Sequence, residues 1–152
     1  MLSSRTKYGI HSLIFLSHRF GGGFVAIKDI SDSERIPRKF LEAILLDLKG
    51  AGILISRAGP NGGYALRVPP DQLTLGRVIR ILEGPLALTP CVSQNNYSPC
   101  SDCRSEPECS LKLVMKRVRD ATAEILDQVN FRVLAAEEGR LKPAYPVTMF
   151  EI

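Results

Sequence analysis

A glycine-rich turn between two short apolar segments most restricts how this chain of 152 residues can fold. The turn is Gly59-Pro60-Asn61-Gly62-Gly63, and the segments 53–57 and 64–68 on either side of it have the composition of strands. Two strands joined by so tight a turn form a β-hairpin. The helices that precede the hairpin decide what kind of domain it belongs to.

Three helices are predicted before the hairpin. Apolar residues at helical spacing predict a first helix at about 6–19, with a serine available to cap it and three glycines to end it. A short second helix is predicted at 27–33. A third begins at Pro37, and its apolar residues recur three and four positions apart from 40 to 48.

The second and third helices, joined by a tight turn, form a predicted helix-turn-helix. That spacing alone also suits a plain helical hairpin, but a three-helix unit followed by a β-hairpin is typical of a winged helix. We therefore expect a mainly α fold with a small β-wing, and a winged helix-turn-helix DNA-binding domain at residues 1–85.

Charged residues on the third helix and the wing are the candidate DNA contacts. Arg38 and Lys39 could reach guanine edges or phosphates, and Glu42 could accept a hydrogen bond from cytosine N4. Arg57 and Asn61 on the wing could enter the minor groove. Three further basic residues are predicted phosphate contacts, although each could equally be a solvated surface charge: Arg5, Lys7 and Lys28.

The distribution of charge agrees with this division. Residues 1–85 carry a net charge of +5 and residues 86–152 carry −1, which suits a DNA-binding half followed by a half that need not touch phosphate. We expect no membrane segment and no signal peptide, and hence a cytoplasmic protein. We find no catalytic constellation, so we do not expect an enzyme. His11 and His18 are interpreted as surface or packed side chains rather than ligands.

Four cysteines gather in one polar, proline-containing loop at residues 86–109, and the chain has no others. They are Cys91, Cys100, Cys103 and Cys109. Thiolates are the usual ligands of iron–sulfur clusters, and four of them also suit zinc. A thiol–disulfide switch that uses Cys100 and Cys103 is a further alternative, as are four inert thiols. A cluster-binding protein without a DNA function is a less favoured interpretation.

A long dimerisation helix is predicted after the loop, at 110–137. Its apolar seam spans about six turns, longer than a small domain covers by itself, and comprises Leu111, Val114, Val118, Ala121, Ile125 and Val129. We expect this seam to bury itself against a second copy in a homodimer, with packing on the first helix as the alternative. Two recognition helices in a dimer imply a palindromic operator on double-stranded DNA. Residues 138–152 form a weakly patterned C-terminal tail.

Several segments together resemble the Rrf2 family of bacterial winged-helix regulators, which includes the IscR, NsrR, RirA and CymR types. They are 8–10 in the first helix, 37–42 in the third, 59–64 in the wing, and 74–79 with 82–86 before the loop. The resemblance implies dimeric repressors or activators. Many members sense through an iron–sulfur cluster on the loop before the dimerisation helix, which would make the four cysteines its ligands here.

The sequence departs from the family pattern at several of the implied site residues. Cys100 is an additional thiol, and Lys112 occupies the position of the histidine that IscR-like proteins use. The acidic first-helix ligand of NsrR-like proteins is missing. Ala58 rather than arginine directly precedes the wing Gly-Pro. Arg35 replaces the glycine of the turn before the recognition helix, where we expect a positive φ to be costly.

Overall fold

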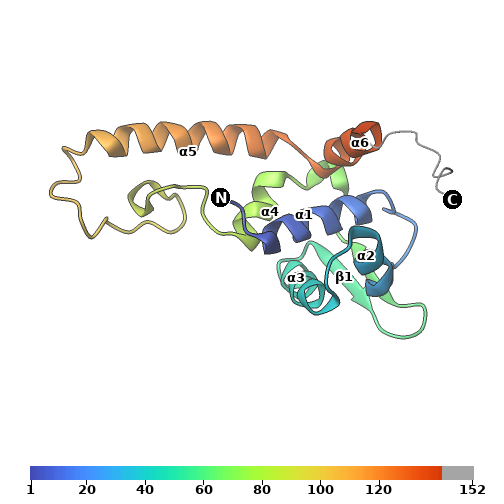
Figure 1. Ribbon diagram of the computed structural model, residues 1–152. Coiled ribbons are helices and arrows are strands. Elements are labelled where there is room, and N and C mark those ends of the chain that lie inside the picture. The colour runs from blue at the N-terminus through green and yellow to red at the C-terminus, as the bar shows by residue number, and fades with distance from the viewer. Residues whose placement is uncertain (142–152) are drawn as a thin grey trace, which may run out of the picture.

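The computed structural model describes residues 1–141 and confirms a mainly helical fold with a two-stranded wing (Figure 1). Short 3₁₀ turns lie at Pro70–Gln72 and Pro90–Val92. The helices and strands, in chain order, are α1 (Ser4–Ser17), α2 (Ile27–Glu34), α3 (Arg38–Gly50), β1 (Leu54–Arg57), β2 (Gly63–Leu66), α4 (Leu75–Leu82), α5 (Ser110–Gln128) and α6 (Phe131–Leu141).

One hydrophobic core holds the winged-helix unit together. α3 contributes one apolar face to it, and Leu41, Ile44, Leu45 and Leu48 are fully buried. Leu13 of α1 is also inaccessible to solvent. Burial of this surface is the main favourable contribution to folding. Because one face of α3 is occupied in this way, its opposite face is left for other partners.

The wing is an antiparallel hairpin in which Leu54 pairs with Leu66 and Arg57 with Gly63. An isolated bridge between Val25 and Tyr64 attaches it to the start of α2, with backbone N···O distances of 2.9 and 2.8 Å. Gly63 has a φ of 146°, and a Cβ there would lie 2.0 Å from the Val25 carbonyl oxygen. The glycine therefore lets the wing approach the helical unit this closely.

The turn between α2 and α3 adopts the positive φ at Arg35 that the sequence analysis expects to be costly. Arg35 adopts the left-handed conformation, with φ 53° and ψ 42°. Ser31 offsets the cost, because its carbonyl oxygen accepts from the Arg35 and Ile36 amides and its hydroxyl donates to the Ile36 carbonyl at 2.7 Å. The buried Ile36 side chain adds apolar contact. A network of local contacts thus replaces the usual glycine.

The segment predicted as one dimerisation element at 110–137 is two helices, which corrects the sequence interpretation. The break occurs because residues 129–131 pair with the chain before α4. Leu75 N donates to the Val129 carbonyl at 2.8 Å, and Phe131 N donates to the Leu73 carbonyl at 3.0 Å. α6 then packs on α1, with the Phe131 side chain fully buried. Residues 138–141, expected in a tail, belong to α6, and 142–152 lie outside the described residues.

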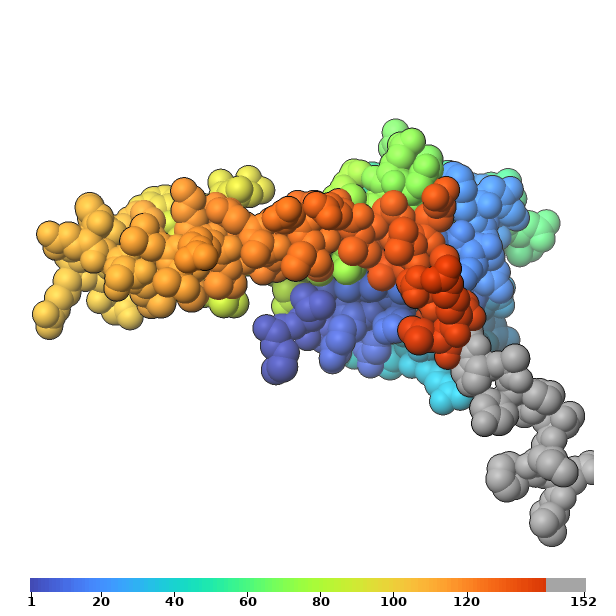
Figure 2. Space-filling view, turned by 90° about the horizontal axis from the view of Figure 1, so that it is seen from above, coloured from blue at the N-terminus to red at the C-terminus, as the bar shows by residue number. Residues whose placement is uncertain are grey.

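The long helix and the cysteine loop together project from the body of the molecule. Figure 2 shows α5 (orange) and the loop (yellow) side by side, extending away from the winged-helix unit. α5 contacts α4 near its C-terminal end, at Asp127, and contacts the 3₁₀ turn Pro90–Val92 at Arg119. None of the helices within residues 1–141 is long and apolar enough to cross a membrane.

Candidate DNA interface and cysteine loop

The exposed face of α3 carries the residues predicted to meet DNA. Arg38 and Glu42 lie one turn apart and form an ion pair of 3.4 Å, and both side chains are more than half exposed. Lys39 is exposed beside them. The pair holds Arg38 at the N-terminal end of the helix, where recognition helices contact base edges. All three side chains are therefore accessible, and their contacts with DNA stay predictions.

Sequence reasoning missed two apolar residues on this helix. Phe40 is 61% exposed, although its helical spacing predicted a core position. Leu46 is 57% exposed. Apolar side chains on a DNA-facing helix can contact the thymine methyl group in the major groove. The order of apolar residues along α3 does not separate these two from the buried ones.

On the wing, the structure brings Arg57 and Asn61 together. The Arg57 guanidinium donates to the Asn61 carbonyl at 3.2 Å and lies 4.7 Å from the centre of the Phe24 ring. Both Arg57 and Asn61 are exposed. Arg57 is therefore held along the wing, and its use as a minor-groove contact stays a prediction.

The three predicted phosphate contacts differ in their surroundings. Lys7 and Lys28 are exposed. Arg5, in contrast, donates to the Leu82 carbonyl at 2.8 Å and pairs with Asp47 of α3. These bonds tie α1 to α3 and α4, so a phosphate would have to compete with them for Arg5.

The four cysteines lie in the predicted loop as free, half-buried thiols. Cys100 is hydrogen-bonded to Cys91, and this contact is the main cause of a raised pKa for the Cys100 thiol. The pKa of Cys103 is also raised, first by burial and then by the proximity of Cys109. The loop thus places the thiols in two pairs, 91 with 100 and 103 with 109. The redox pair inferred from the sequence, Cys100 with Cys103, instead forms a turn with a backbone N···O distance of 3.3 Å.

Polar side chains that the sequence did not single out for this role anchor the loop. Tyr97 donates to Glu106 at 2.7 Å, and Lys112 of α5 forms an ion pair with the same carboxylate. Lys112 and Tyr97 together lower the pKa of Glu106. Arg119, further along α5, donates to the Val92 carbonyl. Lys112, the residue in place of a family histidine, therefore holds the loop against the first turn of α5.

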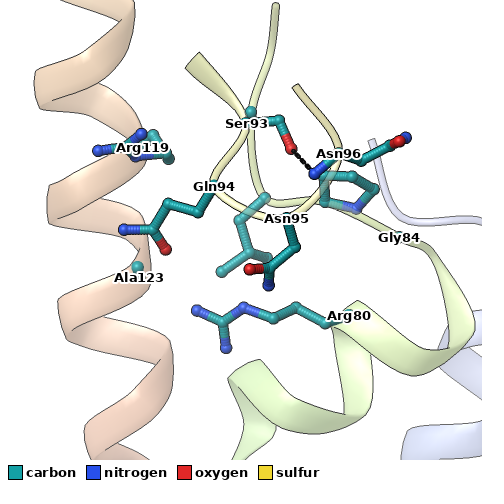
Figure 3. A pocket seen from close by; sticks show the side chains of 11 residues that line it. Arg80, Gly84, Ser93, Gln94, Asn95, Asn96, Arg119 and Ala123 are labelled. Atoms are coloured by element: carbon teal, nitrogen blue, oxygen red, sulfur yellow. Dashed lines mark hydrogen bonds between the residues drawn. The ribbon is translucent and has the colours of Figure 1, made fainter. Parts of the chain in front are cut away.

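A hollow of about 220 Å³ lies between the loop, α4 and α5. Figure 3 shows Asn95 of the loop pointing toward Arg80 of α4, whereas Gln94 points toward α5 near Ala123. The loop is closed above it by a hydrogen bond of 3.1 Å from the Asn96 amide to Ser93 Oγ. A change in the loop can thus alter the contacts between α4 and α5.

The link between α5 and the DNA-binding unit is a two-bond ion pair. Arg80 of α4 donates to both carboxylate oxygens of Asp127 at 2.6 and 2.9 Å. This contact lowers the pKa of Asp127 and raises that of Arg80. Gly76 makes room for it, because a Cβ at that position would lie 2.0 Å from an Asp127 oxygen. α5 is therefore coupled directly to the helix that packs on α1 and α3.

The apolar seam of α5 lies on the surface of this chain. Not one residue of the helix is buried. Val118 is 38% and Ile125 is 65% exposed, and α5 makes its helix–helix contacts mainly with α4 rather than with α1. The alternative of packing on the first helix is therefore wrong. The seam is available to a partner.

Comparisons with known proteins agree with this architecture. Residues 2–137 match the Rrf2 family, described as "Iron-dependent Transcriptional regulator". An rrf2-like HTH-type transcriptional regulator of Rhodobacter capsulatus is 32% identical over 139 residues, 90% of this chain and 93% of that protein. The HTH-type transcriptional regulator CymR of Bacillus subtilis is 31% identical over 144 residues, which are 95% of this chain and 96% of that protein.

Solved structures are similar over nearly the whole chain. The structure of CymR, the global cysteine regulator of B. subtilis, matches with a TM-score of 0.74 and covers 90% of this chain and 97% of its own. The structure of T. potens IscR matches with a TM-score of 0.73 at 25% identity, covering 96% and 93%.

Proposed function

The chain belongs to the Rrf2 family of transcriptional regulators, and we propose that its cysteine loop binds an iron–sulfur cluster whose presence changes operator affinity. The protein is a regulator rather than an enzyme. Its operator-binding form is a homodimer that acts on double-stranded DNA in the cytoplasm.

The clustering of the four thiols carries the proposal. The pKa of Cys100 is raised first by its hydrogen bond with Cys91, and the pKa of Cys103 is raised first by burial and then by the charge of Cys109, so repulsion between neighbouring thiolates contributes to both shifts. Positively charged iron relieves that repulsion, and metal binding displaces the thiol protons. The donor set fits a cluster ligated by Cys91, Cys103 and Cys109, with Cys100 as the fourth ligand. A thiol–disulfide switch is less favoured, because reactive thiols usually have lowered pKa values.

A bound cluster would make the occupancy of the loop depend on iron supply and on oxidation state. The chain's own residues convert that occupancy into a signal. Cys109 directly precedes α5, so ligation fixes the start of this helix. Two side chains of α5 then transmit the position of this helix to the winged-helix unit. Arg119 bonds to the loop, and Asp127 bonds to α4. Cluster occupancy changes DNA affinity if the dimer has one geometry with the cluster and another without it, and the two geometries bind DNA unequally.

The test is the visible absorption spectrum and the iron and zinc content of full-length protein purified without oxygen. We expect a coloured protein that contains iron. Cys109→Ser should abolish the colour and Cys100→Ser should make it labile. Ser101→Ala, in the same loop, is the matched control and should leave the spectrum unchanged.

Other results would contradict the proposal in distinguishable ways. Stoichiometric zinc without iron would identify a zinc-responsive loop. A colourless protein that loses two free thiols on mild oxidation would identify a disulfide switch. Full operator affinity with all four cysteines replaced and no metal bound would show that the loop is not the sensor.

A further inference from the structure

A second cluster of metal-binding residue types lies away from the cysteine loop, where three helices meet. His11 is on α1, Glu34 is the last residue of α2, and Glu138 is on α6. One ligand atom from each of these side chains lies within 4.8 Å of the other two. His18, two turns along α1 from His11, has its Nε2 3.4 Å from an oxygen of Glu138. The three residues are separated widely in the sequence, and the packing of α2 and α6 on α1 brings them together.

We propose that His11, Glu34 and Glu138 bind a divalent first-row transition-metal ion that joins α6 to α1 and α2. An imidazole with two carboxylates is a ligand set that suits Mn²⁺, Fe²⁺ and Zn²⁺. Ligand atoms about 2.1 Å from one ion are separated from each other by about 3–4 Å. Small rotations of the two glutamate side chains therefore bring the present arrangement to that spacing.

The charges of the cluster favour a cation. Two carboxylates face one another across the site, and like charges at this separation repel. Glu34 accepts a hydrogen bond from Ser33 at 3.2 Å and forms no ion pair with a lysine or arginine among residues 1–141. A divalent ion would neutralise the two carboxylates together.

The position of the cluster gives the ion a structural effect. Glu34 directly precedes Arg35, whose left-handed conformation directs the chain into the recognition helix α3. Glu138 belongs to α6, which continues from the long helix α5 after a two-residue break. The ion would therefore hold the end of α2 against the C-terminal helix. This site uses none of the four cysteines, so it can be tested independently of the proposed iron–sulfur cluster.

Mn²⁺ is the probe, because it prefers oxygen and nitrogen ligands over thiolates. Binding to full-length protein is followed by the loss of the electron paramagnetic resonance signal of free Mn²⁺. We expect one ion per chain in the wild type and in a variant with all four cysteines changed to serine. Even the loss of an outer-shell partner typically weakens metal binding about 10- to 100-fold, so Glu34→Gln, Glu138→Gln and His11→Ala should each weaken it by at least about tenfold.

Glu137→Gln is the matched control, because Glu137 is the next residue of α6 and pairs with Arg140 instead. It should bind Mn²⁺ as the wild type does. Thermal unfolding gives a second readout: free Mn²⁺ at about 100 times its dissociation constant should raise the midpoint by roughly 5–10 °C in the wild type but not in Glu138→Gln. Absence of stoichiometric binding, or equal loss in Glu137→Gln and Glu138→Gln, would overturn the proposal.

Discussion

At the scale of single residues, Glu83 shows how one side chain fixes the start of the fold. Its carboxylate accepts hydrogen bonds from Ser3 N at 3.0 Å, from Ser3 Oγ at 2.7 Å and from the Thr6 hydroxyl. The bond from Thr6 is the main cause of a pKa lowered to about 2. These contacts join the N-terminus of α1 to the end of α4.

This lowered pKa predicts how stability depends on pH. A carboxyl whose folded-state pKa is below its unfolded value stabilises the protein above the unfolded pKa. The contribution of Glu83 is then lost as the pH falls from about 4.5 toward 2. We expect Glu83→Gln to unfold more easily at pH 7 and to lose less further stability on acidification. Urea unfolding across this pH range measures both, with Glu124→Gln on the exposed face of α5 as control. An unchanged acid profile in Glu83→Gln would contradict the assignment.

Arg38 is the residue for which we predict the clearest effect on DNA. We expect Arg38→Ala to weaken specific binding by about 1–3 kcal/mol and to relax the sequence preference at one position. Glu42 forms an ion pair with Arg38, so Glu42→Gln should alter specificity too, because it removes the negative charge and replaces one carboxylate oxygen with an amide donor. Fluorescence titration of operator variants measures this. Uniform weakening across all sequences would instead identify Arg38 as a phosphate contact.

At the scale of elements, α6 is held to the body by one side chain above all. Phe131 is fully buried in the core formed by the winged-helix unit. Its truncation to alanine leaves a cavity, and Phe→Ala changes in protein cores cost about 3–5 kcal/mol. We expect that loss in the free energy of unfolding of Phe131→Ala, measured by urea denaturation. Val133→Ala, at an exposed position of the same helix, should change it by less than about 1 kcal/mol.

The exposed seam of α5 predicts the effect of charges on assembly. In a dimer, aspartates at 118 and 125 would be buried without partners, which costs several kcal/mol. We therefore expect Val118→Asp with Ile125→Asp to give a folded monomer by analytical ultracentrifugation. Arg117→Asp, off the seam, should stay dimeric. A wild type that is already monomeric at micromolar concentration would show that α5 is not the interface.

The elements also show what sequence patterns could and could not predict. Periodicity and turn residues located the helices α1 to α3 and the wing to within a few residues, because each has its own start and stop signals. The break after Gln128 was missed, since it depends on Val129 and Phe131 pairing with the distant Leu73 and Leu75. The bond from Arg119 to the Val92 carbonyl, which anchors the cysteine loop, was missed for the same reason. Contacts between segments far apart in sequence leave no local pattern.

At the scale of the whole molecule, the proposed dimer through the exposed seam of α5 would make the DNA site a property of two chains. A dimer formed through α5 has a two-fold axis, so each operator half-site must be related to the other by the same symmetry. The winged-helix unit lies to one side of the projecting helix (Figure 1), so pairing of two α5 helices separates the two recognition helices in space. The coupling between Arg80 and Asp127 then fixes that separation.

This coupling predicts a strict requirement for half-site spacing. We expect a palindromic operator with half-sites about one helical turn, or a small multiple of it, apart. Insertion of about five base pairs at its centre rotates one half-site by about half a turn and should reduce affinity to that of a single half-site. In Asp127→Ala, which breaks the link between α5 and α4, the wild-type operator should bind more weakly while the penalty for the insertion becomes smaller. Gel-shift titrations of both operators with both proteins give the four affinities. An equal insertion penalty in the two proteins would show that the ion pair does not set the spacing.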